Sequence, residues 1–552
     1  MFKSKKPPLE ANTLFDKDTR SESLHSSSNS FPPVGDHIKR KLQLRHVQLI
    51  AIGGSIGTGL FLQIGIDLTT SGPLGLLLSF AFWTVIILML TVSVGEMVSF
   101  LPVASPFVTL AGRCVDEAFE CCVGFNFFIM QALYIPFEIV AVNNFVHYWR
   151  DDYSAAITLC VQIVLYAAIN VFAVKLYGEV EFWLSLGKLV LCIGLLLFTL
   201  VSMCGGNPQH DAFGFRNWHA VGGPIAEYRS TGSLGRFEGF LSGLIGALFI
   251  VVGPEYMSMV AGEAVNPRKN MPTAFKTVLY RLALVYIGGA LSVTILVAYN
   301  DPDYLKTTTE STSASSPYVV GMTNLGIKVL PDIVNAVVLT SAFSAGNSYT
   351  FCSSRALYGL AERGFVPRVF TKCTKKGVPI YCIAVSMLFS LLSLLQLGSS
   401  SAIALNYMVN LCTGAQLLNY GFMVIIYYKF YQAVKAQGLD RRAFAYRSWL
   451  QPYTILISGF FIWIMIFVKG YTCFKPFSVD NFLFNYVMIF VSIIVYVFWK
   501  VFKRTKMVKP EEADLVTGID EIEEHEYEYY AQVESESGKD VTLVRRLFSW
   551  VF

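Results

Sequence analysis

Twelve apolar segments of the chain are each long enough to cross a lipid bilayer. They cover residues 47–67, 73–100, 121–147, 154–174, 181–204, 240–262, 276–299, 330–357, 378–397, 402–428, 450–471 and 481–502. A helix needs about 20 apolar residues to span the hydrocarbon core. Only 15% of the residues are charged, whereas a soluble protein carries about 25%. The sequence therefore predicts an all-α polytopic membrane protein, with a disordered tail (1–46), a twelve-helix core (47–502) and a second tail (503–552).

Basic residues gather on one side of the predicted membrane. The loops after the sixth, eighth and tenth segments carry Arg268, Lys269, Arg363, Arg368, Lys372, Lys375, Lys376, Lys435, Arg441, Arg442 and Arg447. Both tails are also basic where they meet the core, at residues 39–45 and 500–506. Because loops rich in Lys and Arg stay in the cytosol, we expect both termini to be cytosolic. The even number of segments agrees with this orientation.

The first segment contains a stretch that is poorly suited to a continuous helix. Residues 50–66 read "IAIGGSIGTGLFLQIGI" and include five glycines, and glycine is among the weakest helix formers. Non-helical backbone at membrane depth survives only where it lines a cavity or is buried in protein. We therefore expect a broken helix, whose freed amides between Ser55 and Gly59 form an anion site.

The sixth segment carries a second interruption. It reads "FLSGLIGALFIVVGPEYMSMVAGEA", with Gly253 and Pro254 at its centre. Proline lacks an amide hydrogen and clashes with the preceding turn, so carbonyls between Phe249 and Val252 lose their partners. The freed amides of the first segment can donate to a carboxylate, and the freed carbonyls of the sixth can accept from an ammonium group. Together they suit a zwitterion such as an amino acid. Glycine used only for close helix packing is the alternative reading.

Several motifs resemble those of the fungal amino acid permeases, within the amino acid–polyamine–organocation superfamily. The matching stretches are "RHVQLIAIGGSIGTGLF", "SGPLGLLLSF", "VGEMVSFLP", "VKLYGEVEFWLSLGKL", "GEAVNPRKNMPTAF" and "SAFSAGNSYTFCSSRALYGLAERGFVPRVF". The resemblance as a whole covers about residues 40–505. Outer-loop stretches such as "NPQHDAFGFRNW" and "VAYNDP" look closest to the dicarboxylic amino-acid permease branch.

This resemblance implies the five-plus-five inverted-repeat fold of the bacterial leucine transporter, followed by two extra C-terminal helices. It also implies uptake of L-amino acids with protons across the plasma membrane by alternating access. The dicarboxylic branch implies a preference for aspartate and glutamate. Three alternatives stay open: a general permease of broad specificity, a sensor that binds amino acids without transport, and a facilitator or exchanger without proton coupling.

The resemblance also assigns candidate binding residues. The substrate carboxylate would meet the amides of Thr58 and Gly59 and the Thr58 hydroxyl. The ammonium would meet carbonyls at Ser55, Phe249 and Val252, with the Phe249 ring as an aromatic gate. The predicted substrate-binding residues are Ser55, Gly57, Thr58, Gly59, Phe249, Val252 and Gly253. One departure concerns specificity, because many members have a small Gly-Thr pair before Glu255 where this chain has Gly253-Pro254.

A substrate side chain would need its own partners in the cavity. No cavity arginine that could meet a side-chain carboxylate is evident in the sequence. The amides of Gln131, Asn347 and Asn410 would have to serve instead.

Four ionisable residues within the predicted spans need an explanation, because each costs several kcal/mol at bilayer depth unless it is paired. Related proton-coupled members place a lysine at the position of Lys188. Burial opposes its charged form, so Lys188 can exchange a proton during transport. Glu138 and Glu255 are further candidates for coupling or gating. For all three a purely structural role is the alternative, and for Glu96 a structural pairing with a basic loop residue is the favoured reading.

The remaining motifs exclude some functions. The sequence contains no metal-spaced Cys/His cluster, Walker-type loop or nucleophile elbow, so we expect no metal site, no cofactor and no enzyme activity. The loop "NPRKNMP" is better suited to orient the chain than to bind nucleic acid.

Cys204 and Cys473 fall near one predicted face, so a disulfide between them is possible. Family tails take part in trafficking and ubiquitin-dependent turnover, with Lys3, Lys5, Lys6 and Lys17 as candidate acceptors.

Overall fold

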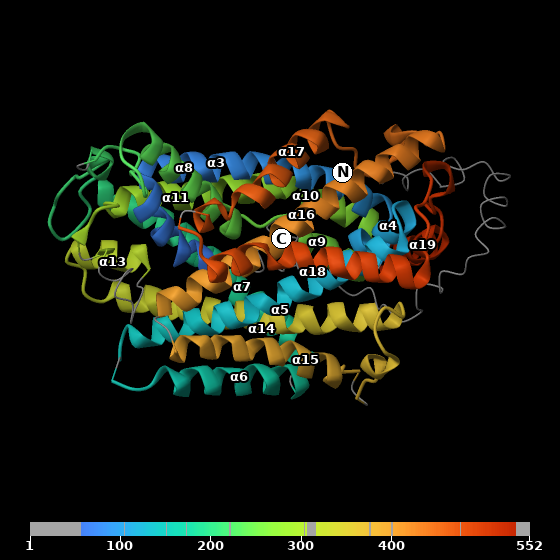
Figure 1. Ribbon diagram of the computed structural model, residues 1–552, viewed down its shortest axis with the longest axis horizontal. Coiled ribbons are helices and arrows are strands. Elements are labelled where there is room, and N and C mark those ends of the chain that lie inside the picture. Colours follow the sequence, from blue (N-terminus) through green and yellow to red (C-terminus); the bar gives the residue numbers. More distant parts are fainter. Residues whose placement is uncertain are drawn as a thin grey trace.

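The computed structural model is a bundle of long helices that run side by side along one axis (Figure 1). It describes residues 57–536 except 104, 151, 173, 220–221, 303, 306–315, 375–376, 399–400 and 475. Within this part of the chain, ten helical stretches are long and apolar enough to cross a membrane. The predicted disordered tail, the start of the first span and Ser55 lie outside the described residues.

The first two predicted spans meet at a sharp turn. Helix α3 (Gln63–Phe100) contains the last residues of the first span, 63–67, and the whole second span. Gly72 interrupts it with φ 72° and ψ 170°, and Pro73 follows. A Cβ on Gly72 would lie 2.5 Å from the Ala226 nitrogen, so glycine is required both for the backbone angle and for this close contact.

The other ten predicted spans also coincide with helices. Together with the first two they form two sets of five, followed by two additional spans. The first set continues with α5 (Glu117–His147), α6 (Ala155–Phe172) and α7 (Val174–Met203). The second set comprises α8 (Gly232–Ile250) with α9 (Pro254–Val260), then α10 (Pro267–Arg281) joined through a π-turn to α11 (Gly288–Leu296), then α14 (Leu330–Glu362), α15 (Ile380–Ser390) with a 3₁₀ extension to Leu397, and α16 (Ser401–Ala436). Helices α17 (Tyr453–Val468) and α18 (Val479–Lys503) are the two additional spans. Two short helices lie in loops, α4 (Pro106–Cys114) and α13 (Pro317–Asn324).

Helix α14 is the span whose composition is least apolar, and it does not meet the criterion for a membrane helix. Its polar side chains are buried against protein rather than lipid, and Ser341, Ser344, Thr350, Ser353 and Ser354 are each at most 2% exposed. Thr350 bonds the Gly346 carbonyl four residues back at 2.9 Å. Ser353 and Ser354 likewise bond carbonyls of their own helix. Small hydroxyl residues satisfied in this way allow α14 to pack closely along α5.

Helices differ in how much of their surface the protein covers. Within the apolar stretch of each helix, 89% of the residues of α5 and α16 are buried in the protein, whereas only 22% of those of α6 and α18 are buried. Exposed apolar residues cover the outer helices, as at Val164 and Phe172 of α6. The central helices α5 and α16 are therefore enclosed by the rest of the protein, and the outer helices present apolar side chains outward.

Glu96, near the end of the second span, is paired as expected for a structural carboxylate. Arg441 donates from Nε to Oε1 at 2.6 Å and from Nη2 to Oε2 at 2.7 Å. Tyr427 and Ser448 also donate to Glu96. This bidentate pair ties the second span to the segment between the tenth and eleventh spans.

The disulfide considered between Cys204 and Cys473 is absent, because both are free thiols in the structure.

The chain after the last span returns to the core. Figure 1 places α19 (Ile519–Glu536) beside α4, at the end of the bundle opposite α13. Arg113 of α4 donates to the Thr517 carbonyl at 2.7 Å, and Arg268 approaches Glu523 at 3.5 Å. Leu515, Ile519 and Ile522 are at most 2% exposed. The start of the acidic tail is thus packed onto the transporter core by apolar burial as well as by charge.

We expect Leu515→Asp to release this segment, because a carboxylate buried without a partner is costly. Limited proteolysis of purified protein should then cut the tail after Lys503 much faster than in the parent chain, while the core stays resistant. Tyr527→Asp, at a side chain that is 78% exposed, is the matched control. Equal cleavage of the two variants would show that burial of Leu515 does not hold the segment.

Candidate substrate-binding site

The first span is not α-helical where the glycine-rich stretch ends. Gly57 is extended, with φ −97° and ψ 179°, and residues Thr58–Leu60 form one 3₁₀ turn. The amides of Phe61 and Leu62 both bond the Thr58 carbonyl, at 3.0 and 2.9 Å. The α-helix starts only at Gln63. The predicted break in the first span is therefore confirmed.

The sixth span is also broken at the predicted place. Helix α8 ends at Ile250 and α9 begins at Pro254, with a short irregular segment between them. The Val252 amide donates to the Tyr286 hydroxyl at 3.4 Å. A Cβ on Gly253 would lie 2.5 Å from Ile87 Cγ2, so the backbone here packs directly against the second span.

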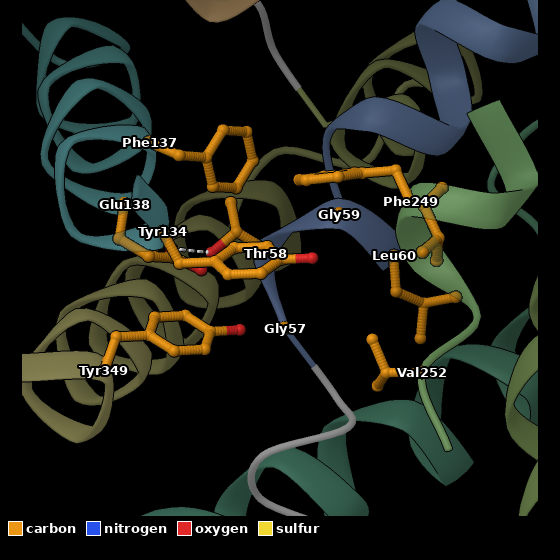
Figure 2. A pocket seen from close by; sticks show the side chains of 11 residues that line it. Gly57, Thr58, Gly59, Leu60, Tyr134, Phe137, Glu138, Phe249, Val252 and Tyr349 are labelled. Atoms are coloured by element: carbon orange, nitrogen blue, oxygen red, sulfur yellow. Dashed lines mark hydrogen bonds between the residues drawn. The ribbon is translucent and has the colours of Figure 1, made fainter. Parts of the chain in front are cut away.

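A small cavity lies between the two breaks (Figure 2). Its volume is about 20 Å³, which is room for about one water molecule. It is lined by Gly57, Thr58, Gly59, Leu60, Tyr134, Phe137, Glu138, Phe249, Ile250, Val252 and Tyr349. Both broken spans, α5 and α14 thus contribute to one cavity, which in this structure is too small for an amino acid.

Aromatic rings close the cavity. Tyr134, Phe137 and Glu138 share one face of α5, because residues three and four apart are neighbours on a helix. The Tyr134 ring stacks on Tyr349 of α14, with centroids 4.7 Å apart, and on Phe249 at 5.7 Å. Phe137 meets Phe249 edge to face at 4.9 Å. The Phe249 ring also lies close to Gly59 (Figure 2).

A protein carboxylate engages the predicted anion site. The Thr58 hydroxyl donates a short hydrogen bond to Glu138 Oε2, drawn as a dashed line in Figure 2. Thr58 is fully buried and Glu138 is 1% exposed. Glu138 is also the one charged side chain among the described residues that line the cavity. A substrate carboxylate that binds at Thr58 must therefore displace Glu138 or share the hydroxyl with it.

Lys188 is near the site but does not line the cavity. Its Nζ lies 3.8 Å from Glu181 Oε1, one face of α7 carrying both residues. Ser344 of α14 donates to Glu181 Oε2 at 2.8 Å. Lys188 and Glu181 are 1% and 6% exposed. The predicted coupling lysine is thus part of a buried ionic group that joins the fifth and eighth spans.

Glu255 is the second residue of α9, directly after the break in the sixth span. The Tyr420 hydroxyl donates to Glu255 Oε1 at 3.1 Å, and Gln416 Nε2 donates to that hydroxyl at 2.8 Å. Tyr134 in turn donates to Gln416 Oε1. A continuous chain of hydrogen bonds therefore connects the cavity wall with the carboxyl group beside the break in the sixth span.

The structure brings most predicted binding residues together. Gly57, Thr58, Gly59, Phe249 and Val252 line the cavity, Glu138 joins them, and Gly253 is next in the chain. The amides expected to meet a substrate side chain do not line it. Gln131 bonds Tyr256, Asn347 bonds Asn170, and Asn410 bonds Asn406.

Sequence reasoning did not find Tyr134, Phe137, Tyr349 or Glu181. A signal was available for Tyr134, which lies four residues before Glu138 on one helical face, and through it for Phe137, which follows Tyr134 by three residues. For Glu181, the spacing of seven residues from Lys188 puts both on one face of a helix. No pattern within α14 distinguishes Tyr349 from a buried packing residue.

The fold is that of a membrane transporter built on an inverted repeat, with a cavity between two broken helices. The solved structure of a mutant of the manganese transporter from Eremococcus coleocola has this fold, with a TM-score of 0.54. The alignment covers 85% of this chain and 99% of that one at 13% identity. The same transporter in complex with an aromatic bis-isothiourea substituted compound gives a TM-score of 0.52.

The amino acid permease family model matches residues 46–511, and the chain belongs to this family. The general amino acid permease AGP2 of Saccharomyces cerevisiae is 47% identical over 93% of this chain and 87% of its own length. The dicarboxylic amino acid permease of that yeast is 36% identical over 92% and 85%, and its lysine-specific permease is 35% identical over 88% and 80%. These relatives are permeases and not enzymes, so the chain is a multi-pass membrane permease for amino acids.

Proposed function

We propose that this permease takes up L-amino acids with protons across the plasma membrane by alternating access. The observation that carries the proposal is the meeting of both helix breaks at one buried cavity, with Thr58 on one side and Phe249 on the other. The substrate carboxylate binds the turn at Thr58 and Gly59, and the ammonium binds the carbonyls of the sixth-span break. Glu138, freed from Thr58, becomes a second partner for the ammonium.

Substrate entry requires the site to expand. A cavity of about 20 Å³ cannot hold an amino acid. The rings of Tyr134, Tyr349 and Phe249 form its walls, and the Thr58–Glu138 bond crosses it. Binding therefore coincides with movement of these rings and opening of that bond, which links occupancy to the position of the first and sixth spans.

The cavity favours a broad amino acid preference over an acidic one. Among the described residues that line it there is no lysine, arginine or histidine, and Glu138 would repel a side-chain carboxylate. The 47% identity to a general permease, against 36% to a dicarboxylic one, supports the same choice. We therefore propose the broad-specificity alternative in place of a preference for aspartate and glutamate.

The proton is carried by the buried ionic group of the fifth span. Lys188 exchanges it, Glu181 holds the ammonium in place, and Ser344 orients Glu181 by donating to its other oxygen. Glu138 and Glu255 are the alternatives. The loops around Arg268 and Arg363 face the cytosol, so the packed C-terminal segment is cytosolic as well. The lysines of the N-terminal tail would then be accessible to ubiquitin ligases and the trafficking machinery.

A competition assay tests the binding site and the preference. The purified chain is placed in liposomes, and uptake of a labelled neutral amino acid is measured against unlabelled neutral, basic and acidic competitors. We expect neutral competitors to be the strongest and acidic ones the weakest. Strong competition by aspartate and glutamate alone would restore the acidic preference. Binding of the amino acids without any uptake would identify a sensor.

Substrates are expected to need both α-groups. A buried donor or acceptor left without its partner costs about 1–3 kcal/mol, and more when it is charged. Decarboxylated and deaminated analogues should therefore compete at least about fivefold more weakly than the parent amino acid in the same assay. Equal competition by either analogue would show that the two helix breaks do not bind a zwitterion.

A further inference from the structure

A second buried carboxyl group, Asp67, lies between the two broken spans. It is on the second turn of α3, between the cavity and the turn at Gly72. Its side chain is 5% exposed. On the opposite side lies α8, the half of the sixth span that ends at Phe249 and Ile250. Asp67 is thus in the seam where the two half-helices that line the site pack together.

The contact across this seam is very close. A Cβ on Gly246 of α8 would lie 2.1 Å from the Asp67 Oδ1 atom and 2.2 Å from Oδ2. The backbone of α8 therefore packs directly against the carboxyl group. Gln63 Nε2 donates to Oδ1 at 3.0 Å. Oδ2 has no hydrogen-bond partner among the described residues.

No cation of the described part of the chain balances this carboxyl group. The two helices of the seam carry three other charged side chains. Glu96 of α3 pairs with Arg441, and near the start of α8 Arg236 pairs with Glu227 at 3.7 Å and Glu238 accepts from the Ser230 amide at 3.1 Å. The neighbouring segments add the titratable side chains of Tyr304, Tyr318 and Asp301. Tyr304 interacts electrostatically with Asp67. Tyr318 donates to the Gly289 carbonyl, and the Asp301 carboxylate accepts from Asn324. On α8 itself, Gly246 offers no side chain.

This arrangement suits a neutral carboxyl group. An ionised carboxylate would bury a charge with one oxygen lacking a donor, and burial of an unpaired charge is strongly unfavourable. When the seam opens toward the outside, water can reach Asp67 and satisfy the charged form. Closing the seam then favours uptake of a proton from external water onto Oδ2.

We infer that Asp67 is a proton-binding residue that couples closure of the outer side of the site to external acidity. The inference rests on the proposed proton-coupled uptake and adds a residue to it. The proton moves from water to Asp67 as α3 and α8 close over the occupied cavity. Lys188 and its partners lie on the fifth and eighth spans, so Asp67 is separate from that group.

The test compares Asp67→Asn with the parent chain in liposomes. Asparagine has nearly the same shape but cannot take up the proton. Initial uptake of a mixture of tritiated L-amino acids is measured over a series of external pH values, at fixed internal pH and clamped membrane potential. Uptake by the parent chain should rise as external pH falls, by up to about tenfold per pH unit for one linked proton. The Asp67→Asn variant should lose most of this dependence, and Asp211→Asn, at an exposed ion pair with Arg216, should keep it.

A second measurement applies even where the Asp67→Asn variant transports poorly. Ser242 of α8 donates to Thr70 of α3 at 2.9 Å and so reports on the same seam. Ser242→Cys is labelled with a membrane-impermeant maleimide, and the labelled peptide is counted by mass spectrometry. Acidic external pH should protect the cysteine more strongly when Asp67 is present than when Asp67→Asn is combined with Ser242→Cys.

The outcomes separate the two proposals. Identical pH profiles and identical protection for the parent chain and Asp67→Asn would overturn the role of Asp67 and leave proton coupling intact. A parent chain whose uptake does not depend on external pH would overturn both.

Discussion

Gly59→Val abolishes amino acid uptake while the protein still reaches the membrane; this is the largest effect that the site predicts. A Cβ on Gly59 would lie 3.2 Å from Ile250 Cγ1 and 3.3 Å from Phe249 Cε1. A valine side chain would drive Phe249 from its place and cover the turn where the carboxylate binds. Uptake should fall to background, and surface labelling should show normal amounts of protein.

Two comparisons make this result specific. Gly194→Val is the matched control, because a Cβ on Gly194 of α7 meets nothing within 4 Å. Gly57→Ala is the graded variant. Its Cβ would make ordinary contacts, 3.8 Å from the Tyr349 hydroxyl and 4.0 Å from Glu138, but it points into the cavity. We expect it to fold normally and to weaken substrate affinity. Normal uptake by surface-expressed Gly59→Val would remove the first-span break from the substrate site.

Lys188→Ala removes the dependence of uptake on an inward proton gradient. Lys188 is 1% exposed, and Glu181 and Ser344 hold its surroundings in place. A buried ammonium that can lose its proton can link proton release to movement of the spans that it contacts. Lys188→Arg should fail in the same way, since arginine does not deprotonate in proteins. Initial uptake is measured at several external pH values with internal pH held constant.

The control for this variant must remove both charges. Breaking a buried ion pair from one side costs about 3–5 kcal/mol, because the other charge is left unpaired. Lys188→Ala alone can therefore lower stability as well as coupling. The double variant Lys188→Gln with Glu181→Gln keeps the site neutral and should bind substrate without proton dependence. If Lys188→Ala keeps gradient-driven accumulation, Lys188 is structural and Glu138 and Glu255 become the leading candidates.

The two helix breaks could be predicted from sequence because their causes are local. Glycine clusters and the Gly253-Pro254 pair weaken a helix wherever they occur, and at membrane depth they imply a cavity. The apolar length of each span is likewise a local property, so the predicted segments after the first coincide with helices. The observed ends of the helices differ from the predicted ends of the spans, because polar helical turns continue beyond the apolar stretch. Helix α10, for example, starts at Pro267, whereas the predicted span starts at residue 276.

The walls of the cavity could not be predicted in the same way. Tyr134 and Tyr349 lie more than two hundred residues apart and meet only because α5 packs along α14. The bond from Thr58 to Glu138 joins the first and third spans, and no spacing along the chain reveals it. The surroundings of Asp67 could not be predicted either, since its close contact is with Gly246, which lies far along the chain in the sixth span. Gln131, Asn347 and Asn410 were reasonable candidates by polarity, but each bonds to another residue outside the cavity.

Accumulation of a labelled amino acid in liposomes, with and without an imposed inward proton gradient, tests the central claim most directly. The purified full-length chain is compared with liposomes that lack protein, and an ionophore that exchanges protons for potassium collapses the gradient in a parallel sample. The account predicts accumulation above the external concentration with the gradient, and only equilibration without it. Equal uptake in both samples would contradict proton coupling, and no uptake in either would contradict transport itself.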